Sequence, residues 1–154
     1  MICVECDSDE AFACALGVAK NILNHASGKG SACNLLLKKR GWVAVLDEDP
    51  LSAQPSYLRR LPIKKEENGF RLLEDEKNKH LVVLLCPRLE EWILQTAKSS
   101  GIQVSIFGLP SNADGLHEAL ARRQVREYNL PRMLSALMQN SRIKSLQALL
   151  KGKG

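Results

Sequence analysis

The sequence predicts an α/β fold in which a mainly parallel sheet carries helices on both faces and is followed by C-terminal helices. Up to residue 107, short apolar runs alternate with helical patterns, which is typical of strand–helix–strand crossover units. Beyond that residue only helical patterns remain. The length of 154 residues, with 45% hydrophobic and 25% charged residues, favours one folded domain over a disordered chain.

The first half of the chain is expected to contain three strands and two helices. Asp7 and Glu10 form a capping-box pattern that opens the first helix, and Gly41 ends the second. The last strand is a continuous apolar run, which indicates a strand that is covered on both faces. In chain order, the expected elements are a strand over Met1–Cys6, a helix from Asp7 to Val18, a short strand over Ile22–His25, a helix over Ala32–Arg40 and a strand over Trp42–Leu46.

The second half begins with an expected loop over residues 50–69, which contains three prolines and a lysine–glutamate run. Pro87 suits the first position of a helix, and Ser141 suits the cap of the last one. Strands are expected over Phe70–Leu73, Leu81–Leu85 and Val104–Phe107. Three apolar stripes with helical spacing predict three helices. The stripes are Leu89, Trp92, Ile93, Thr96 and Ala97; Leu130, Met133, Leu134, Leu137 and Met138; and Ile143, Leu146, Leu149 and Leu150.

The charge distribution divides the chain into a balanced part and a basic part. Residues 1–60 and 61–110 each carry seven bases and seven acids, whereas residues 111–154 carry eight bases and three acids. We therefore expect an α/β core over 1–110 and a basic helical extension over 111–154 that packs on the same domain. Such a basic segment favours an anionic partner, DNA or RNA first, and leaves a protein partner and the oligomeric state open.

The sequence also predicts the redox state of the cysteines and the cellular location of the protein. Five scattered cysteines, at an odd count, favour reduced thiols over a disulfide framework. No apolar run approaches the roughly 18 residues that span a bilayer, and the N-terminus lacks the pattern of a secretory signal. We therefore expect a cytoplasmic protein without a membrane segment.

Acidic residues follow three of the expected strands, at the positions where parallel sheets bind their ligands. Glu5 interrupts the end of an apolar strand, where a charge is costly without a partner. Asp47 and Asp49 are two residues apart, so on an extended backbone their carboxylates would point to one side and that of Glu48 to the other. The candidate acids are Glu5, Asp9, Asp47, Asp49 and Glu90. Hard oxygen donors of this kind suit Mg²⁺ or Mn²⁺, which can promote phosphoryl chemistry.

These acidic motifs resemble the Toprim domain of topoisomerases, bacterial primases, recombination proteins and OLD-family nucleases. The resemblance covers about residues 1–107 and rests on Val4-Glu5 with Asp9, on Val-Leu-Asp47-Glu-Asp49, and on Pro87-Arg-Leu-Glu90-Glu-Trp92, the last being closest to OLD-like and small stand-alone Toprim proteins. It implies a Rossmann-like parallel sheet and a nuclease or nicking activity that depends on Mg²⁺ or Mn²⁺. Glu5 would be the general acid/base or a metal ligand, and Asp9, Asp47, Asp49 and Glu90 would hold the metal.

Basic residues that could contact phosphate fall in two regions. The loop His25-Ala-Ser-Gly28-Lys29-Gly30 precedes a helix, where exposed amides and a lysine can meet a phosphate. Further bases lie along the C-terminal helices and can contact the nucleic-acid backbone without reading its sequence. They are Arg122, Arg123, Arg126, Arg132, Arg142 and Lys144.

Two other functions are also compatible with the sequence. Cys6 stands where the family has a glycine after the catalytic glutamate, which favours a non-catalytic module that binds nucleic acid or a protein partner. A phosphoryl-accepting receiver domain also gathers acids at strand ends. It fits less well, because no lysine ends the expected Val104–Phe107 strand.

Overall fold

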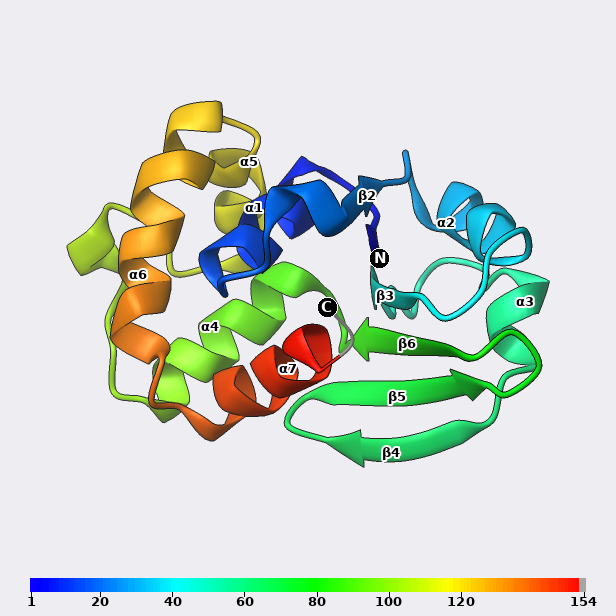
Figure 1. Cartoon of the computed structure of the whole chain (residues 1–154). Coiled ribbons are helices and arrows are strands. Elements are labelled where there is room, and N and C mark those ends of the chain that lie inside the picture. The colour runs from blue at the N-terminus through cyan, green and yellow to red at the C-terminus, as the bar shows by residue number, and fades with distance from the viewer. Residues whose placement is uncertain (153–154) are drawn as a thin grey trace.

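The computed structural model describes residues 1–152 and contains one six-stranded mixed sheet, with α-helices on both of its faces (Figure 1). The strand order is β2-β1-β3-β6-β5-β4, and the first four of these strands run parallel. The α/β class, the mostly parallel sheet and the C-terminal helices are therefore confirmed. The strands are β1 (Ile2–Val4), β2 (Leu23–His25), β3 (Val43–Asp47), β4 (Ile63–Glu67), β5 (Phe70–Asp75) and β6 (His80–Leu85).

The helices alternate with the strands in the first part of the chain and follow one another in the last part. The α-helices are α1 (Asp7–Ala15), α2 (Lys29–Leu36), α3 (Ser56–Arg59), α4 (Leu89–Ser99), α5 (Ala113–Leu120), α6 (Leu130–Leu137) and α7 (Ser141–Lys151). The short helical turns are η1 (Lys20–Ile22), η2 (Val104–Phe107) and the π-helical turn η3 (Val125–Asn129).

The sheet separates two apolar cores of different size. The larger core joins one face of the sheet to α1, α4 and the C-terminal helices. In it, Trp92 of α4 is fully buried and meets Phe12 of α1 edge to face, with 5.7 Å between the ring centres. The smaller core joins the other face to α2 and α3. The stripes on α4 and α6 face the larger core as their spacing predicts, because residues three and four apart share one helix face. No helix within residues 1–152 has the length and apolar character that crossing a bilayer requires.

Two predictions of secondary structure are wrong. Residues 50–69 are not a plain loop: they contain α3 and the edge strand β4, which pairs antiparallel with β5. The sequence of β4, Ile-Lys-Lys-Glu-Glu, lacks an apolar run because an edge strand with exposed side chains needs none, and its charges discourage pairing with other chains. Val104–Phe107 is a 3₁₀ turn instead of a strand; only Val104 in it is buried, while Ile106 is 72% exposed.

The helix ends also differ from the expected ones. Cys6, and not Asp7, caps α1, and the Asp9 carboxylate accepts a hydrogen bond from the Cys6 amide. Asn140 caps α7 through its side chain in place of Ser141. Helix α2 starts and stops earlier than Ala32–Arg40, and α4 begins after Pro87 with Arg88 as its cap. In α1 and α7 a neighbouring residue bonds a free backbone amide of the first turn, and in α2 and α4 the boundary shifts by a few residues.

His80 ties the start of β6 to the end of α2. Its ring is fully buried, its Nδ1 accepts a hydrogen bond from the Trp42 amide at 3.0 Å, and its Nε2 lies 2.9 Å from the Leu36 carbonyl oxygen. The Trp42 contact fixes the proton on Nε2, which therefore donates to the carbonyl.

Replacing His80 by alanine leaves a cavity and unpaired backbone groups, so we expect a loss of about 2–4 kcal/mol in the free energy of unfolding. Denaturant titration measures it. Lys77→Ala, at an exposed site in the same β5–β6 turn, should change the stability by less than about 0.5 kcal/mol. Equal effects of the two substitutions would contradict the structural role of His80.

Candidate functional site

The predicted acids lie at the carboxyl edge of the parallel strands, at the point where the chain reverses its direction across the sheet. From β1 the chain passes through α1 to β2 on one side, and then through α2 to β3 on the other side of β1. Sheets of this type bind ligands at such a switch point. Glu5 directly follows β1 and Asp47 ends β3, so both residues stand at this point.

Glu5 and Asp47 are coupled by a direct contact. The Glu5 carboxylate accepts a hydrogen bond from the Asp47 amide at 2.9 Å, and Asp47 Oδ1 accepts one from the Leu89 amide at 2.8 Å. Burial raises the pKa of Glu5 to about 7, and nearby Asp9 and Asp49 add to the effect, although the Asp47 amide and Lys29 oppose it. Burial, followed by the charges of Asp9, Glu5 and Glu90, raises the pKa of Asp47 to about 8.

Asp9 and Glu90 complete the buried part of this acidic edge. Asp9, in the first turn of α1, is 3% exposed, and Glu90, in the first turn of α4, is 4% exposed. Burial raises the pKa of Asp9 to about 6, partly opposed by hydrogen bonds from Cys6, and the charge of Glu90 adds to the rise. The two residues come from helices that pack on the same face of the sheet, which explains why acids far apart in sequence interact.

Asp49 reaches this edge by a different backbone path from the expected one. Strand β3 ends at Asp47, and Asp49 has a left-handed φ of 50°, so the two aspartates are not alternate residues of one extended strand. The Asp49 amide donates to the Pro87 carbonyl oxygen at 2.8 Å, which holds this turn beside the segment that follows β6. Glu48 is turned toward β5, where its carboxylate pairs with Arg71.

The donor set suits a hard cation, although the side chains are turned to protein groups. Glu5, Asp47 and Asp9 each accept a hydrogen bond from a backbone amide, and burial, followed by the charges of neighbouring acids, raises the pKa of each carboxyl group. Carboxylate oxygens of this kind match the preference of Mg²⁺ and Mn²⁺. Within residues 1–152, no three Asp, Glu, His or Cys side chains are arranged as a formed set of ligands.

The loop over residues 25–30 borders the acidic edge. The Gly28 amide donates to the Glu5 carbonyl oxygen at 3.1 Å, and Gly28 has a φ of 102°, which favours glycine at this position. Lys29 Nζ donates to the Glu48 carbonyl oxygen at 3.0 Å, and Gly30 lies in the exposed first turn of α2. Lys29 is thus a predicted cation beside the acidic edge, where its charge lowers the pKa of Glu5.

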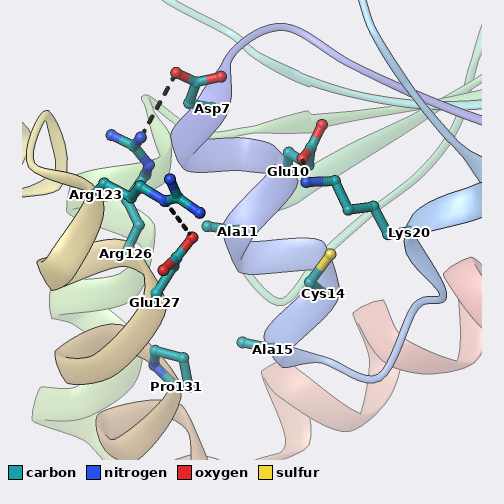
Figure 2. A pocket seen from close by; sticks show the side chains of 10 residues that line it. All are labelled: Asp7, Glu10, Ala11, Cys14, Ala15, Lys20, Arg123, Arg126, Glu127 and Pro131. Carbon is teal, nitrogen blue, oxygen red and sulfur yellow. Dashed lines mark hydrogen bonds and ion pairs between the residues drawn. The ribbon is translucent and has the colours of Figure 1, made fainter.

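Asp7 contacts two further residues that are predicted to bind phosphate. Its carboxylate lies 3.4 Å from His25 Nδ1. It also lies 3.7 Å from Arg126 Nη2 (Figure 2). Arg126 also donates to the carbonyl oxygens of Leu120 and Ala121, both at 2.9 Å, so it fastens the end of α5 as well. His25 and Lys29, from the loop over residues 25–30, and Arg126, from η3, form a basic rim beside Asp7 and the turn that follows β1.

The remaining C-terminal bases divide into exposed and structural residues. Arg122, Arg123, Arg132 and Lys144 are exposed, and Arg123 pairs with Glu127 at 2.7 Å. Arg142 lies 4.9 Å from the centre of the Trp92 ring and donates to Thr96 Oγ1 at 2.8 Å. Burial lowers its pKa. Arg142 therefore stabilises the packing of α7 on α4 and is removed from the set of phosphate candidates.

Sequence reasoning missed two residues at this edge. His117 Nδ1 lies 2.8 Å from the buried Glu90 carboxylate, and Arg88 pairs with Glu91 at 2.7 Å. Arg88 follows β6 just as Glu5 follows β1, so the strand-end argument could have found it. His117 has no such signal, because α5 brings it to Glu90 across 27 residues of chain.

Comparison with known proteins gives no match. The chain matches no family model, no curated protein and no solved structure. The functional interpretation therefore depends on the site itself and on the motifs of the sequence.

Proposed function

We propose that this chain is a Toprim-like protein that uses Mg²⁺ or Mn²⁺ to act on phosphodiester bonds of nucleic acid, as a nuclease or nicking enzyme. The observation that carries the proposal is the contact between Glu5 and Asp47 at the switch point of the sheet, with both pKa values raised by burial and by further acids. Buried carboxylates that repel one another are costly, and a divalent cation would offset that cost.

The residues of the acidic edge support separate roles in this activity. Asp47, Asp49, Asp9 and Glu90 would hold the cation, which when bound supplies positive charge to a transferring phosphoryl group. Glu5 would exchange a proton with the reacting water or leaving oxygen, the general acid/base role that the resemblance implies.

The basic rim would hold the nucleic acid at this edge. Lys29, His25 and Arg126 would orient the neighbouring phosphates, because Lys29 lies near Glu5 while His25 and Arg126 both face Asp7, two residues further along the chain. Asp7 would compete with phosphate for His25 and Arg126, since its carboxylate now lies between them.

A second function is favoured by two specific observations. No formed set of three ligands exists within the described residues, and Cys6 replaces the glycine that follows the catalytic glutamate in the Toprim family. A non-catalytic module that binds nucleic acid, or a partner protein, would keep the fold and the basic residues without cleavage.

Cleavage assays on the whole chain separate the two functions. Plasmid DNA and labelled single- and double-stranded DNA and RNA are incubated with Mg²⁺, Mn²⁺ or EDTA, and the products are resolved on denaturing gels. We expect cleavage with Mg²⁺ or Mn²⁺ and none with EDTA. The Asp47→Asn/Asp49→Asn variant should lose cleavage by roughly 10²- to 10⁴-fold while it still binds nucleic acid. Salt-sensitive binding without cleavage of any substrate would overturn the nuclease proposal in favour of the binding module.

A further inference from the structure

We propose that the groove between α1 and the η3–α6 segment binds single-stranded nucleic acid, with one base stacked on Tyr128. The inference rests on the proposed function in one respect: the bound strand would be cleaved at the acidic edge, beside which the groove begins. The binding itself is independent of cleavage and can be tested without it.

The groove begins beside the acidic edge and ends near the start of α6. It encloses about 490 Å³, and its wall runs from Asp7 and Glu10 on α1 to Arg123, Arg126 and Pro131 on the opposite side (Figure 2). Asp7 stands two residues after Glu5, so this end of the groove adjoins the turn that carries Glu5. A second hollow, lined by Arg123, Glu127 and Tyr128, shares residues with this groove and extends it to the outer surface of η3.

Tyr128 presents an aromatic face to solvent at this outer end. It is 61% exposed, and it is the only aromatic residue among the exposed large apolar side chains of residues 1–152. The guanidinium of Arg132 lies 5.4 Å from the ring centre, so the aromatic surface is already paired with a cation. A base that stacks on an aromatic ring next to an arginine is the usual arrangement in proteins that bind single strands.

The backbone around Tyr128 is held in place before any ligand binds. Val125 is buried, Asn129 donates to the Phe107 carbonyl oxygen at 2.9 Å, and Arg126 donates to two carbonyl oxygens at the end of α5. These anchors flank Tyr128 on both sides in sequence. The ring is therefore presented from a fixed turn, which lowers the entropy lost when a base stacks on it.

The charges in the groove favour a single strand over a duplex. Its cations are matched by acids: Lys20 pairs with Glu10 at 3.1 Å, Arg123 with Glu127 at 2.7 Å and Arg126 with Asp7 at 3.7 Å. A balanced groove attracts the dense charge of a duplex backbone weakly, so stacking must supply much of the affinity. Bases are available for stacking only in a single strand, while the exposed Arg122 and Arg132 can contact its phosphates.

Fluorescence anisotropy with labelled oligonucleotides tests the inference. The measurements use the Asp47→Asn background in EDTA, so that no cleavage occurs, and compare a single strand with a duplex of the same length. We expect Tyr128→Ala to raise the Kd for the single strand by roughly 5- to 50-fold. Tyr128→Phe should stay within about threefold, because the ring is kept. Ile106→Ala removes an exposed apolar side chain from η2, outside the groove, and should change the Kd by less than about twofold.

Photocrosslinking places the base independently of affinity. A 5-iodouracil-labelled single strand should crosslink to the peptide that contains Tyr128, and the yield should fall in Tyr128→Ala, whose thermal unfolding is recorded to show that it folds. A Kd unchanged by Tyr128→Ala, or preferred binding of the duplex, would overturn the inference. Failure of the chain with an intact Tyr128 to bind the single strand, together with cleavage of a duplex, refutes only this inference, whereas Tyr128-dependent binding without any cleavage refutes only the proposed activity.

Discussion

Without divalent cations, the free energy of unfolding is expected to fall as the pH rises from about 4 to about 8. Glu5, Asp9 and Asp47 have pKa values of about 7, 6 and 8 in the folded protein, against 4.5, 3.8 and 3.8 for the free groups. Between these limits the folded chain binds more protons than the unfolded chain. Stability therefore decreases as the pH rises and levels off above the folded pKa values.

The size of this effect follows from the proton linkage. Each pKa unit corresponds to about 1.4 kcal/mol. The three shifts are coupled through mutual repulsion and Asp47 is partly open to solvent, so they do not add, and the summed loss is on the order of several kcal/mol. Denaturant titrations at a series of pH values in EDTA would measure it. Stability that is constant, or that rises, between pH 5 and pH 8 would contradict the buried, mutually repelling acids.

Asp47→Asn is expected to remove much of this pH dependence and to stabilise the cation-free protein at pH 8. The asparagine oxygen can still accept the hydrogen bond from the Leu89 amide, while the charge that repels Glu5, Asp9 and Glu90 is gone. Glu76→Gln, an exposed acid in the β5–β6 turn, is the matched control and should leave the pH profile unchanged. Mg²⁺ or Mn²⁺ should stabilise the original chain at pH 8 and have little effect on Asp47→Asn.

The sequence predicts the central strands well because burial leaves a clear pattern. Leu81–Leu85 is apolar throughout since β6 is covered on both faces, and Trp42–Leu46 corresponds to β3 for the same reason. Strand β4 leaves no such pattern, because its side chains are exposed and its pairing with β5 depends on backbone hydrogen bonds. At Val104–Phe107 an apolar pattern is present, but an apolar run of four residues does not distinguish a strand from a short helical turn.

The candidate site could be predicted where it follows from strand order and not where it depends on side-chain partners. Glu5 and Asp47 were found because residues that follow parallel strands meet at one edge. The pairing of His117 with Glu90 depends on where α5 packs, and the pairing of Arg142 with Trp92 depends on where α7 packs. Positive charges on a helix therefore predict a basic surface, but the sequence does not tell which arginines pack against other parts of the protein and which face solvent.

Binding of nucleic acid is expected to weaken strongly when the exposed bases at the end of α5 are reversed. Arg122→Glu/Arg123→Glu should lower the affinity for all sequences alike, by roughly 10- to 100-fold at low salt, because about two phosphate contacts are lost. The slope of log K against log salt should become smaller by roughly 2. Arg126 is left intact, since it also holds the end of α5 and pairs with Asp7.

The matched control applies the same change of charge at the opposite edge of the sheet. Lys38 and Arg40 are exposed after α2 and just before β3, so they lie at the amino end of the parallel strands, away from the acids. Lys38→Glu/Arg40→Glu has the same net charge as Arg122→Glu/Arg123→Glu, and a long-range effect of net charge would weaken binding equally in both. If only the α5 variant loses affinity and salt dependence, the phosphates contact that surface, whereas equal losses would show that the basic extension acts through total charge alone.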